Sequence, residues 1–213
     1  MKNYDAIIFD LDGVITDTAA LYYAAWKRLA DELGIYFDKA INESLKGVDR
    51  MASLEIILKK SDGQYTNEEK LLLADKKNGY YKQLVEQMTP NDILPEVKTL
   101  LEKLRTRNVK IALASASKNT FTVIDKLGLQ PYFDYIVNVG KIKCSKPDPE
   151  IFITAANALL VPCDKCIGVE DAKAGIKAAG MFAVGIGSLE ILCEADDVIS
   201  GLNKFNIDKY QIS

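Results

Sequence analysis

Short apolar runs that end in polar residues recur along this chain, and they constrain its fold more than any other feature. The first run, Ala6–Phe9, is directly followed by Asp10. A continuous apolar run of this length is typical of a strand buried on both faces of a parallel sheet. We therefore expect further strands where the pattern returns, over residues 109–114, 135–137, 166–169 and 182–186, with a last short strand at 197–199.

Helical patterns separate these runs. Pro95 is tolerated in a first helical turn, and apolar residues then recur at helical spacing from Val97 to Leu104. Residues 148–160 and 171–179 are also expected to be helical, the second ending at a glycine. Strands that alternate with helices indicate βαβ units with right-handed crossovers. The predicted fold class is α/β, with a Rossmann-like parallel-sheet core.

The long stretch between the first and second apolar runs contains no convincing strand. Thr66 and Glu69 predict a capping box at the start of one helix. The sequence thus predicts a helical cap domain over residues 16–89, inserted into an α/β core domain formed by residues 1–15 and 90–213, with a hinge at the two connections. The predicted buried faces of the cap helices are Tyr22, Trp26, Leu29 and Leu33 in the first, and Leu73, Tyr80, Leu84 and Met88 in the second.

The charge composition disfavours several classes of partner. The chain has 27 basic and 30 acidic residues spread along its length, whereas a nucleic-acid binder usually shows a basic excess. It has no apolar run near the ~20 residues that span a bilayer, and its start does not resemble a signal peptide. With four cysteines and no such signal, we expect a cytoplasmic protein, monomeric because coiled-coil heptads are lacking, without nucleic-acid or membrane partners.

The chain contains no histidine. This excludes Ser-His-Asp and Cys-His nucleophilic pairs, phosphohistidine chemistry and His-ligated zinc. If the protein is an enzyme, carboxylates are the best candidates for acid–base work near neutral pH.

Two pairs of carboxylates follow predicted strands. Asp10 and Asp12 come directly after the first strand, and Glu170 and Asp171 follow the strand at 166–169. Taken singly, the first pair fits an ordinary Asp-rich turn and the second fits a helix cap. Two such pairs at the ends of buried strands favour a Mg²⁺ site, because four acids would repel one another without a hard cation.

Two further strand ends offer partners for an anion. Ser115 ends the strand at 109–114 and precedes a helix start, where a hydroxyl and backbone N–H groups form either an anion site or a plain helix cap. Lys146 lies in a stiff loop between prolines and is a candidate phosphate partner, although most lysines are simply solvated. These groups are the ones that phosphoryl transfer through an aspartyl-phosphate requires: two acids, a hydroxyl, a lysine and a bound metal ion.

The order of these motifs resembles the haloacid dehalogenase superfamily. Within it, four segments are similar to the β-phosphoglucomutase family, whose members are isomerases. These segments are DLDGVITDT at 10–18, LKGVDR at 45–50, ALASASKN at 112–119 and SKPDPEIF at 145–152.

The resemblance implies a set of residue roles. Asp10 would be the nucleophile and Asp12 the general acid and base, while Ser115 and Lys146 would bind the transferring phosphoryl group. Mg²⁺ would be held by Asp10, the Asp12 carbonyl, Glu170 and Asp171. The substrate-binding residues would be Thr16, Gly47, Val48, Arg50, Lys77, Ser115, Ala116, Ser117, Lys118 and Asn119.

The implied reaction interconverts β-D-glucose 1-phosphate and glucose 6-phosphate, small-molecule sugar phosphates, with β-D-glucose 1,6-bisphosphate as intermediate and activator. A sugar-phosphate phosphatase of the same superfamily is the alternative, and a catalytically silent phosphosugar-binding protein is a third hypothesis. The full set of acids argues against the silent binder. A dehalogenase would have no use for Asp12 or the metal acids.

Several residues have simpler interpretations. Tyr22 stands where the family has a histidine, which puts the coupling of cap closure to Asp12 in doubt. Arg50 and Lys77 are, taken alone, solvated charges, and Trp26 fits the cap core. Cys163 and Cys166 have the spacing of a redox or zinc motif, but the chain offers no second pair and no histidine, so we expect neither.

Overall fold

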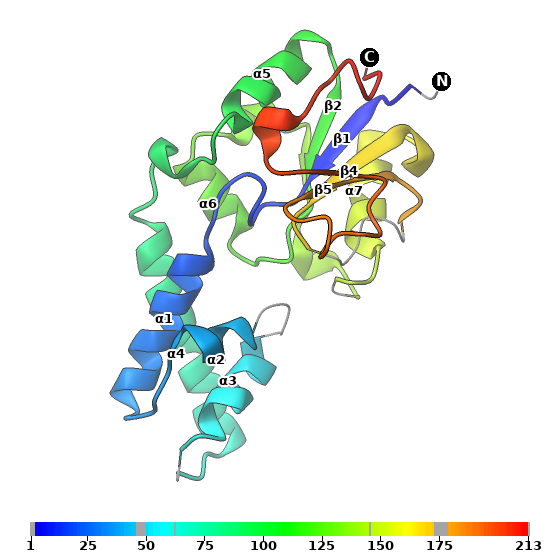
Figure 1. The fold of residues 1–213 in the computed structure, drawn as a ribbon. Helices are drawn as coiled ribbons and strands as arrows, with labels where there is room; N and C mark the ends of the chain where they lie inside the picture. Colours follow the sequence, from blue (N-terminus) through cyan, green and yellow to red (C-terminus); the bar gives the residue numbers. More distant parts are fainter. Residues whose placement is uncertain (1–2, 46–49, 62, 145, 173–178, 213) are drawn as a thin grey trace. The chain divides into compact units, whose positions relative to one another are not determined.

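The computed structural model describes residues 3–45, 50–61, 63–144, 146–172 and 179–212. The chain forms two compact units (Figure 1). One combines Met1–Asp17 with Met88–Ser213, and the other is the segment Thr18–Gln87.

The first unit, the α/β unit, is built on a parallel sheet in the order β3-β2-β1-β4-β5-β6. All the strand regions expected from the sequence form, and the predicted α/β class is confirmed. The strands are β1 (Ala6–Phe9), β2 (Lys110–Leu113), β3 (Tyr135–Ile136), β4 (Cys166–Glu170), β5 (Phe182–Ile186) and β6 (Asp197–Ile199).

Helices cover this sheet. α7 (Glu150–Leu159) buries Phe152 completely against β1 and β2, a burial that contributes roughly 1.5–3 kcal/mol. α5 (Val97–Thr106) packs against β2 through the apolar face that the sequence predicted. The remaining elements are α6 (Thr120–Lys126) and the 3₁₀-helices η1 (Pro90–Asp92), η2 (Gln130–Tyr132), η3 (Val139–Lys141), η4 (Cys163–Lys165) and η6 (Leu202–Lys204). The helix expected over 171–179 falls largely on residues 173–178, outside the described residues.

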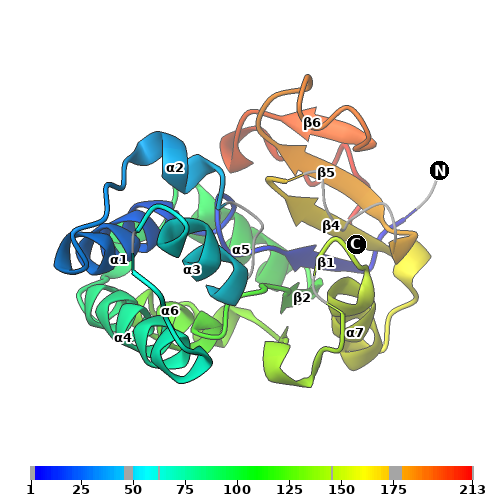
Figure 2. The same cartoon turned by 90° about the horizontal axis from the view of Figure 1, so that it is seen from below.

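The strand order places β1 at the centre of the sheet, between β2 and β4 (Figure 2). From β1 the chain continues to one side through β2 and β3, and later to the other side through β4, β5 and β6. Ligands of open α/β sheets bind beyond the carboxyl ends of the strands where the order reverses in this way. Phe9 pairs with Val169 of β4, so the residues that follow them, Asp10 and Glu170, lie at this switch point.

The second unit, the helical unit, consists of α1 (Ala19–Glu32), α2 (Lys39–Glu43), α3 (Arg50–Leu58) and α4 (Asn67–Val85). α1 and α4 lie side by side. The predicted capping box is present: the Glu69 carboxylate accepts the Thr66 backbone N–H at 2.8 Å, and the Thr66 hydroxyl accepts the Glu69 N–H at 3.3 Å.

The buried face of α4 differs in part from the predicted one. Tyr80 and Met88 are buried as expected, but Leu73 and Leu84 are only half-buried, and Ala74, Lys77 and Tyr81 are buried as well. A pattern of large apolar residues misses this face because it omits a small alanine and a lysine. On α1, Trp26 and Leu29 are buried as expected, but Tyr22 and Leu33 are half-buried.

Among the described residues, no helix has both the length and the apolar character required to cross a membrane.

Candidate active site

The nucleophile candidate Asp10 is fixed by the register of the central strands. Its backbone N–H donates to the Val169 carbonyl at 2.9 Å, and the Ala114 N–H donates to the Phe9 carbonyl at 2.8 Å. These bonds extend the sheet by one residue past β1 and hold Asp10 between the ends of β2 and β4. Asp10 is 7% exposed, so its carboxylate is largely shielded from solvent.

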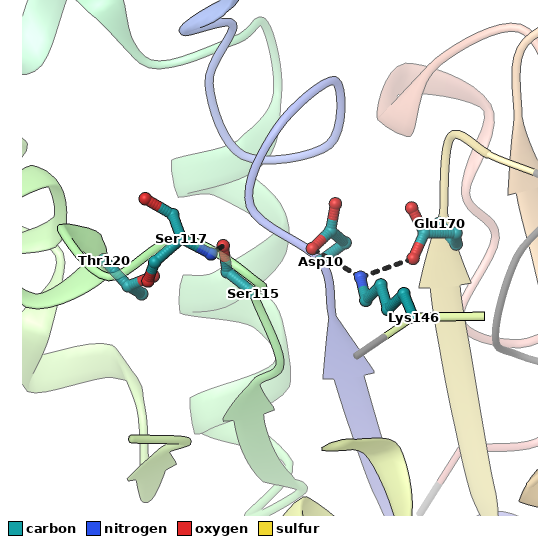
Figure 3. A network of polar contacts seen from close by, with 6 residues as sticks. All are labelled: Asp10, Ser115, Ser117, Thr120, Lys146 and Glu170. Atoms are coloured by element: carbon teal, nitrogen blue, oxygen red, sulfur yellow. Dashed lines mark hydrogen bonds and ion pairs between the residues drawn. The ribbon is translucent and has the colours of Figure 1, made fainter. Parts of the chain in front are cut away.

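Lys146 joins the two acidic strand ends (Figure 3). Its ammonium donates to Asp10 Oδ1 at 2.7 Å and to Glu170 Oε2 at 2.6 Å. Burial disfavours charge on Lys146, but the two carboxylates outweigh it and raise its pKa. The lysine is therefore held as a cation.

Three of the predicted metal-binding acids converge. Carboxylate oxygens of Asp10, Glu170 and Asp171 lie within 4.8 Å of one another. Burial, with a further contribution from Asp10, raises the pKa of Glu170 well above its usual value and also raises that of Asp171. When all three are ionised beside the Lys146 cation, a net charge of minus two is left over. This oxygen-rich, electrostatically unbalanced group fits a divalent hard cation such as Mg²⁺.

Gly13 makes room for this cluster. Its φ of +72° is in the left-handed region, and a Cβ added there would lie 2.1 Å from Asp171 Oδ2. The glycine is required both by the backbone turn and by the close approach of the Asp171 carboxylate.

Ser115 begins a loop organised by hydroxyl groups. Ser115 is 2% exposed, and its Oγ accepts the Ser117 N–H at 3.1 Å. Ser117 Oγ in turn accepts the Asn119 N–H at 3.2 Å. The Thr120 hydroxyl donates to the Ser117 carbonyl at 2.7 Å (Figure 3). These bonds hold the loop at the end of β2, with Ala116 and Lys118 exposed and Asn119 buried.

A protein-family model described as haloacid dehalogenase-like hydrolase matches residues 4–182, which include all of these groups. The chain belongs to the haloacid dehalogenase-like hydrolase family. The superfamily resemblance inferred from the sequence motifs is thereby confirmed.

Comparison with individual relatives shows which members of this family the chain is similar to. The chain is 46% identical over 199 residues to a β-phosphoglucomutase of Bacillus subtilis, covering 91% of this chain and 88% of that protein. A crystal structure of β-phosphoglucomutase from Clostridium difficile superposes with a TM-score of 0.88 at 46% identity, covering 98% of this chain and 96% of the other. A Thermotoga maritima phosphatase of phosphorylated carbohydrates is 31% identical, covering 82% of this chain and 80% of the relative. The resemblance to the β-phosphoglucomutase family is also confirmed.

The other predicted site residues of this family member are distributed over both units. Asp12 is half-buried at the turn after β1 and forms a backbone bridge with Thr16. Thr16 is fully buried, and its hydroxyl donates to the Asp92 carbonyl at 2.7 Å. Gly47 and Val48 lie outside the described residues.

Arg50 and Lys77 lie together in the helical unit. Arg50 is half-buried, and its Nη2 donates to Asn78 Oδ1 at 2.9 Å. Lys77 is 2% exposed, so the expectation of a solvated lysine is wrong. Its amine lies over aromatic rings, which supply the stabilising contacts that a buried cation otherwise lacks. Helical periodicity placed Tyr22 and Trp26 on a buried face, but it did not pair them with Lys77 and did not single out Asn78, since it treats a lysine as a surface residue.

Proposed function

We propose that the chain is a phosphomutase that interconverts β-D-glucose 1-phosphate and glucose 6-phosphate through an aspartyl-phosphate and β-D-glucose 1,6-bisphosphate. The β-phosphoglucomutases of Bacillus subtilis and Clostridium difficile, each 46% identical to the chain, support the substrate. The observation that carries the reaction class is the Lys146 ammonium between Asp10 and Glu170, which joins a nucleophile, a cation and a metal-binding acid in one group.

In this proposal Asp10 attacks phosphorus and becomes the phosphoaspartate. Lys146 is close enough to neutralise charge on the equatorial oxygens of the transferring group, and Ser115 would bind the same group with its hydroxyl. Splitting the transfer into two displacements at Asp10 replaces one very slow step by two easier ones.

Asp12 would give a proton to the leaving hydroxyl and take one from the attacking hydroxyl. It follows Asp10 by two residues and is half-buried at the same turn. Two acids in different environments can divide the roles of nucleophile and general acid in this way.

Mg²⁺ would be held by the carboxylates of Asp10, Glu170 and Asp171 together with the Asp12 carbonyl. A bound Mg²⁺ supplies charge neutralisation at the phosphoryl oxygens. Glu170 also contacts Lys146, so it would orient the ammonium and the metal at once.

The sugar and its non-reacting phosphate would be bound by the loop at Ala116–Asn119 and by Thr16, Gly47, Val48, Arg50 and Lys77. Arg50 suits the phosphate because its guanidinium is half-buried and is oriented by Asn78. We further propose that the protein acts in the cytoplasm as a monomer, without nucleic-acid or membrane partners. Its four unpaired cysteines suit a reducing compartment.

A sugar-phosphate phosphatase is the second candidate. The 31% identical phosphatase of phosphorylated carbohydrates favours it, because the same core acids would serve a reaction in which water attacks the phosphoaspartate. The two candidates differ in their product, which is glucose 6-phosphate in one case and free phosphate in the other.

The proposal is tested by ³¹P NMR of the protein with Mg²⁺, β-D-glucose 1-phosphate and a trace of β-D-glucose 1,6-bisphosphate. We expect the glucose 6-phosphate signal to grow with little free phosphate, and Asp10→Asn to abolish turnover. Asp5→Asn is the matched control, because Asp5 is an exposed acid at the opposite end of the same strand. Free phosphate as the main product would establish the phosphatase instead, and turnover by Asp10→Asn would refute the assignment of the nucleophile.

A further inference from the structure

Lys146 lies on a loop, whereas its two acid partners are held by the sheet. Glu170 ends β4, and Asp10 directly follows β1 with its backbone N–H bonded to β4. Lys146 instead lies between η3 and α7. Its ammonium is nevertheless 2.7 Å from Asp10 Oδ1 and 2.6 Å from Glu170 Oε2. Fixing a long lysine side chain costs rotamer entropy, so the loop and the side chain both need support from other contacts.

Glu150, the first residue of α7, joins the two ends of this loop. Its carboxylate accepts the Lys143 N–H at 3.0 Å through Oε1 and the Cys144 N–H at 2.6 Å through Oε2. These two hydrogen bonds lower the pKa of Glu150, so the carboxylate is ionised near neutral pH. The Glu150 N–H donates in turn to Asp148 Oδ1 at 2.9 Å. The chain is therefore tied together immediately before and immediately after Lys146.

Phe152, also in the first turn of α7, contacts the lysine itself. Lys146 Nζ lies over the Phe152 ring, 4.9 Å from the ring centroid. The ring is fully buried against β1 and β2, and the Lys146 side chain is only 14% exposed. The attraction of an ammonium to an aromatic face is stronger when both groups are shielded from water. Phe152 thus offers Lys146 a rigid and favourable contact surface.

The three partners of Lys146 differ in how the proposed reaction changes them. Asp10 loses its negative charge when one of its oxygens bonds to phosphorus, and Glu170 would be shared with Mg²⁺. The Phe152 ring takes no part in either change. It can therefore hold the ammonium at the same place before and after Asp10 is phosphorylated, as the ammonium turns from the carboxylate to the phosphoryl oxygens.

We propose that Glu150 and Phe152 are positioning residues for Lys146: the Glu150 carboxylate holds the loop, and the Phe152 ring holds the ammonium. The inference rests on the proposed function, because Lys146 is there assigned to the oxygens of the transferring phosphoryl group. Both residues act through Lys146 and not on the reacting atoms. A displacement of a catalytic group by about 1 Å can lower turnover by about a hundredfold, so support of this kind affects the rate.

The support of Lys146 can be measured without substrate. An ammonium held in buried hydrogen bonds exchanges its protons slowly with water and gives a ¹H–¹⁵N NMR signal, and the loss of that signal in Lys146→Arg identifies it. Glu150→Gln replaces one acceptor oxygen by a donor that opposes a backbone N–H, and Phe152→Leu removes the ring face. We expect each change to accelerate the Lys146 proton exchange by about tenfold or more. Phe152→Met is a second variant with the same expectation.

Matched controls separate this role from general stability. Glu69 also accepts a backbone N–H through its carboxylate, at 2.8 Å, but it lies on α4 of the helical unit. Phe205 is also buried, and its ring contacts Tyr210, remote in sequence from the loop. Glu69→Gln and Phe205→Leu should therefore leave both the Lys146 signal and turnover unchanged.

Turnover gives the second readout. In the ³¹P assay we expect Glu150→Gln and Phe152→Leu each to lower kcat by about tenfold while KM stays within about twofold, because Lys146 acts on the transferring group and not on the sugar. A purely structural role would instead lower kcat in Phe205→Leu as much as in Phe152→Leu.

Faster exchange of the Lys146 protons together with a lower kcat supports the inference. A wild-type protein without a protected Lys146 signal, or variants that exchange at the wild-type rate, would overturn it. Faster exchange with an unchanged kcat would overturn the role in the reaction, and an effect in one variant alone would remove the other residue from the proposal. If the variants accelerate exchange but the wild-type protein yields no glucose 6-phosphate, the proposed reaction fails while the support of Lys146 stands.

Discussion

Gly13 shows how closely single residues constrain the site. It directly follows Asp12 and lies three residues after the nucleophile candidate Asp10. The residue that excludes a side chain at position 13 is nevertheless Asp171, which is distant in sequence. The Asp171 carboxyl group occupies the space where a side chain at position 13 would be, with Cγ 2.5 Å from the added Cβ. The sequence motif Asp-Gly predicts a turn, but the requirement for an absent side chain becomes visible only when both strand ends are placed together.

We expect Gly13→Ala to displace Asp171 and to lower Mg²⁺ affinity and turnover by more than tenfold. Gly128→Ala is the matched control, because Gly128 has a similar φ of +67° but nothing within 4 Å of an added Cβ. Both variants should lose about 1 kcal/mol of stability through left-handed strain. Isothermal titration with Mg²⁺ checks the difference. Equal Mg²⁺ affinity in the two variants would show that Asp171 has room to move.

At the scale of secondary structure, Asp134 fastens the outer part of the sheet. Its backbone N–H donates to the Ile111 carbonyl at 2.8 Å, and its carboxylate accepts the Ile111 N–H at 2.8 Å. The same carboxylate accepts Arg105 Nη1 of α5 at 2.8 Å. A strand as short as β3 gains its position from this side chain as well as from its backbone ladder.

The stability that Asp134 contributes should depend on pH. Burial opposes its charge, but the Ile111 N–H and the Arg105 guanidinium outweigh burial and lower its pKa. Because the folded pKa is below the unfolded value, this stability is present above pH ~4 and is lost as the pH falls through the folded pKa. Asp134→Asn should cost roughly 1–3 kcal/mol at pH 7 and progressively less below pH ~4.

Urea unfolding at pH 7 and at pH 3 measures this change. Asp208→Asn is the control, because Asp208 also pairs with an arginine at 2.8 Å but is 79% exposed, and surface pairs contribute little. If the loss of unfolding free energy in Asp134→Asn is the same at both pH values, the packing of the Asp134 side chain, and not its charge, is what stabilises the fold.

The elements themselves were largely predictable from sequence. Each apolar run forms a strand because a strand buried on both faces leaves few positions for polar residues, as in Ala6–Phe9. The same reasoning placed Asp10, Ser115 and Glu170 at strand ends that the parallel topology then brings together. It failed in part on α4, where Lys77 occupies the buried face, because two of the three aromatic rings that contact it come from another helix. Periodicity within one helix contains no information about such partners.

At the scale of the whole molecule, the chain leaves the α/β unit after Asp17 and returns to it at Met88. The two connecting segments are paired on the α/β side. The Leu94 N–H donates to the Ile15 carbonyl at 3.0 Å, Thr16 and Ile93 form an antiparallel bridge, and the Thr16 hydroxyl donates to the Asp92 carbonyl at 2.7 Å. A rearrangement of one segment must therefore break or move its hydrogen bonds to the other segment, although the two are far apart in sequence.

Thr16→Val should loosen this pairing without changing the shape of the buried side chain. The loss of a buried hydroxyl donor leaves the Asp92 carbonyl unsatisfied and should cost about 1–3 kcal/mol locally. Amide exchange at Leu94 should then accelerate by about 5- to 160-fold, while the amides of β1 at Ile7 and Ile8 stay protected.

Thr16→Ser retains the hydroxyl and should keep slow exchange at Leu94, which separates the hydrogen bond from the packing of the methyl group. Hydrogen exchange followed by NMR resolves the individual amides. If Leu94 exchanges at the wild-type rate in Thr16→Val, the backbone bridge alone holds the two segments together, and their pairing does not depend on a side chain. If exchange rises in both segments together, the Thr16 hydroxyl is the contact that makes the two passages of the chain behave as one connection.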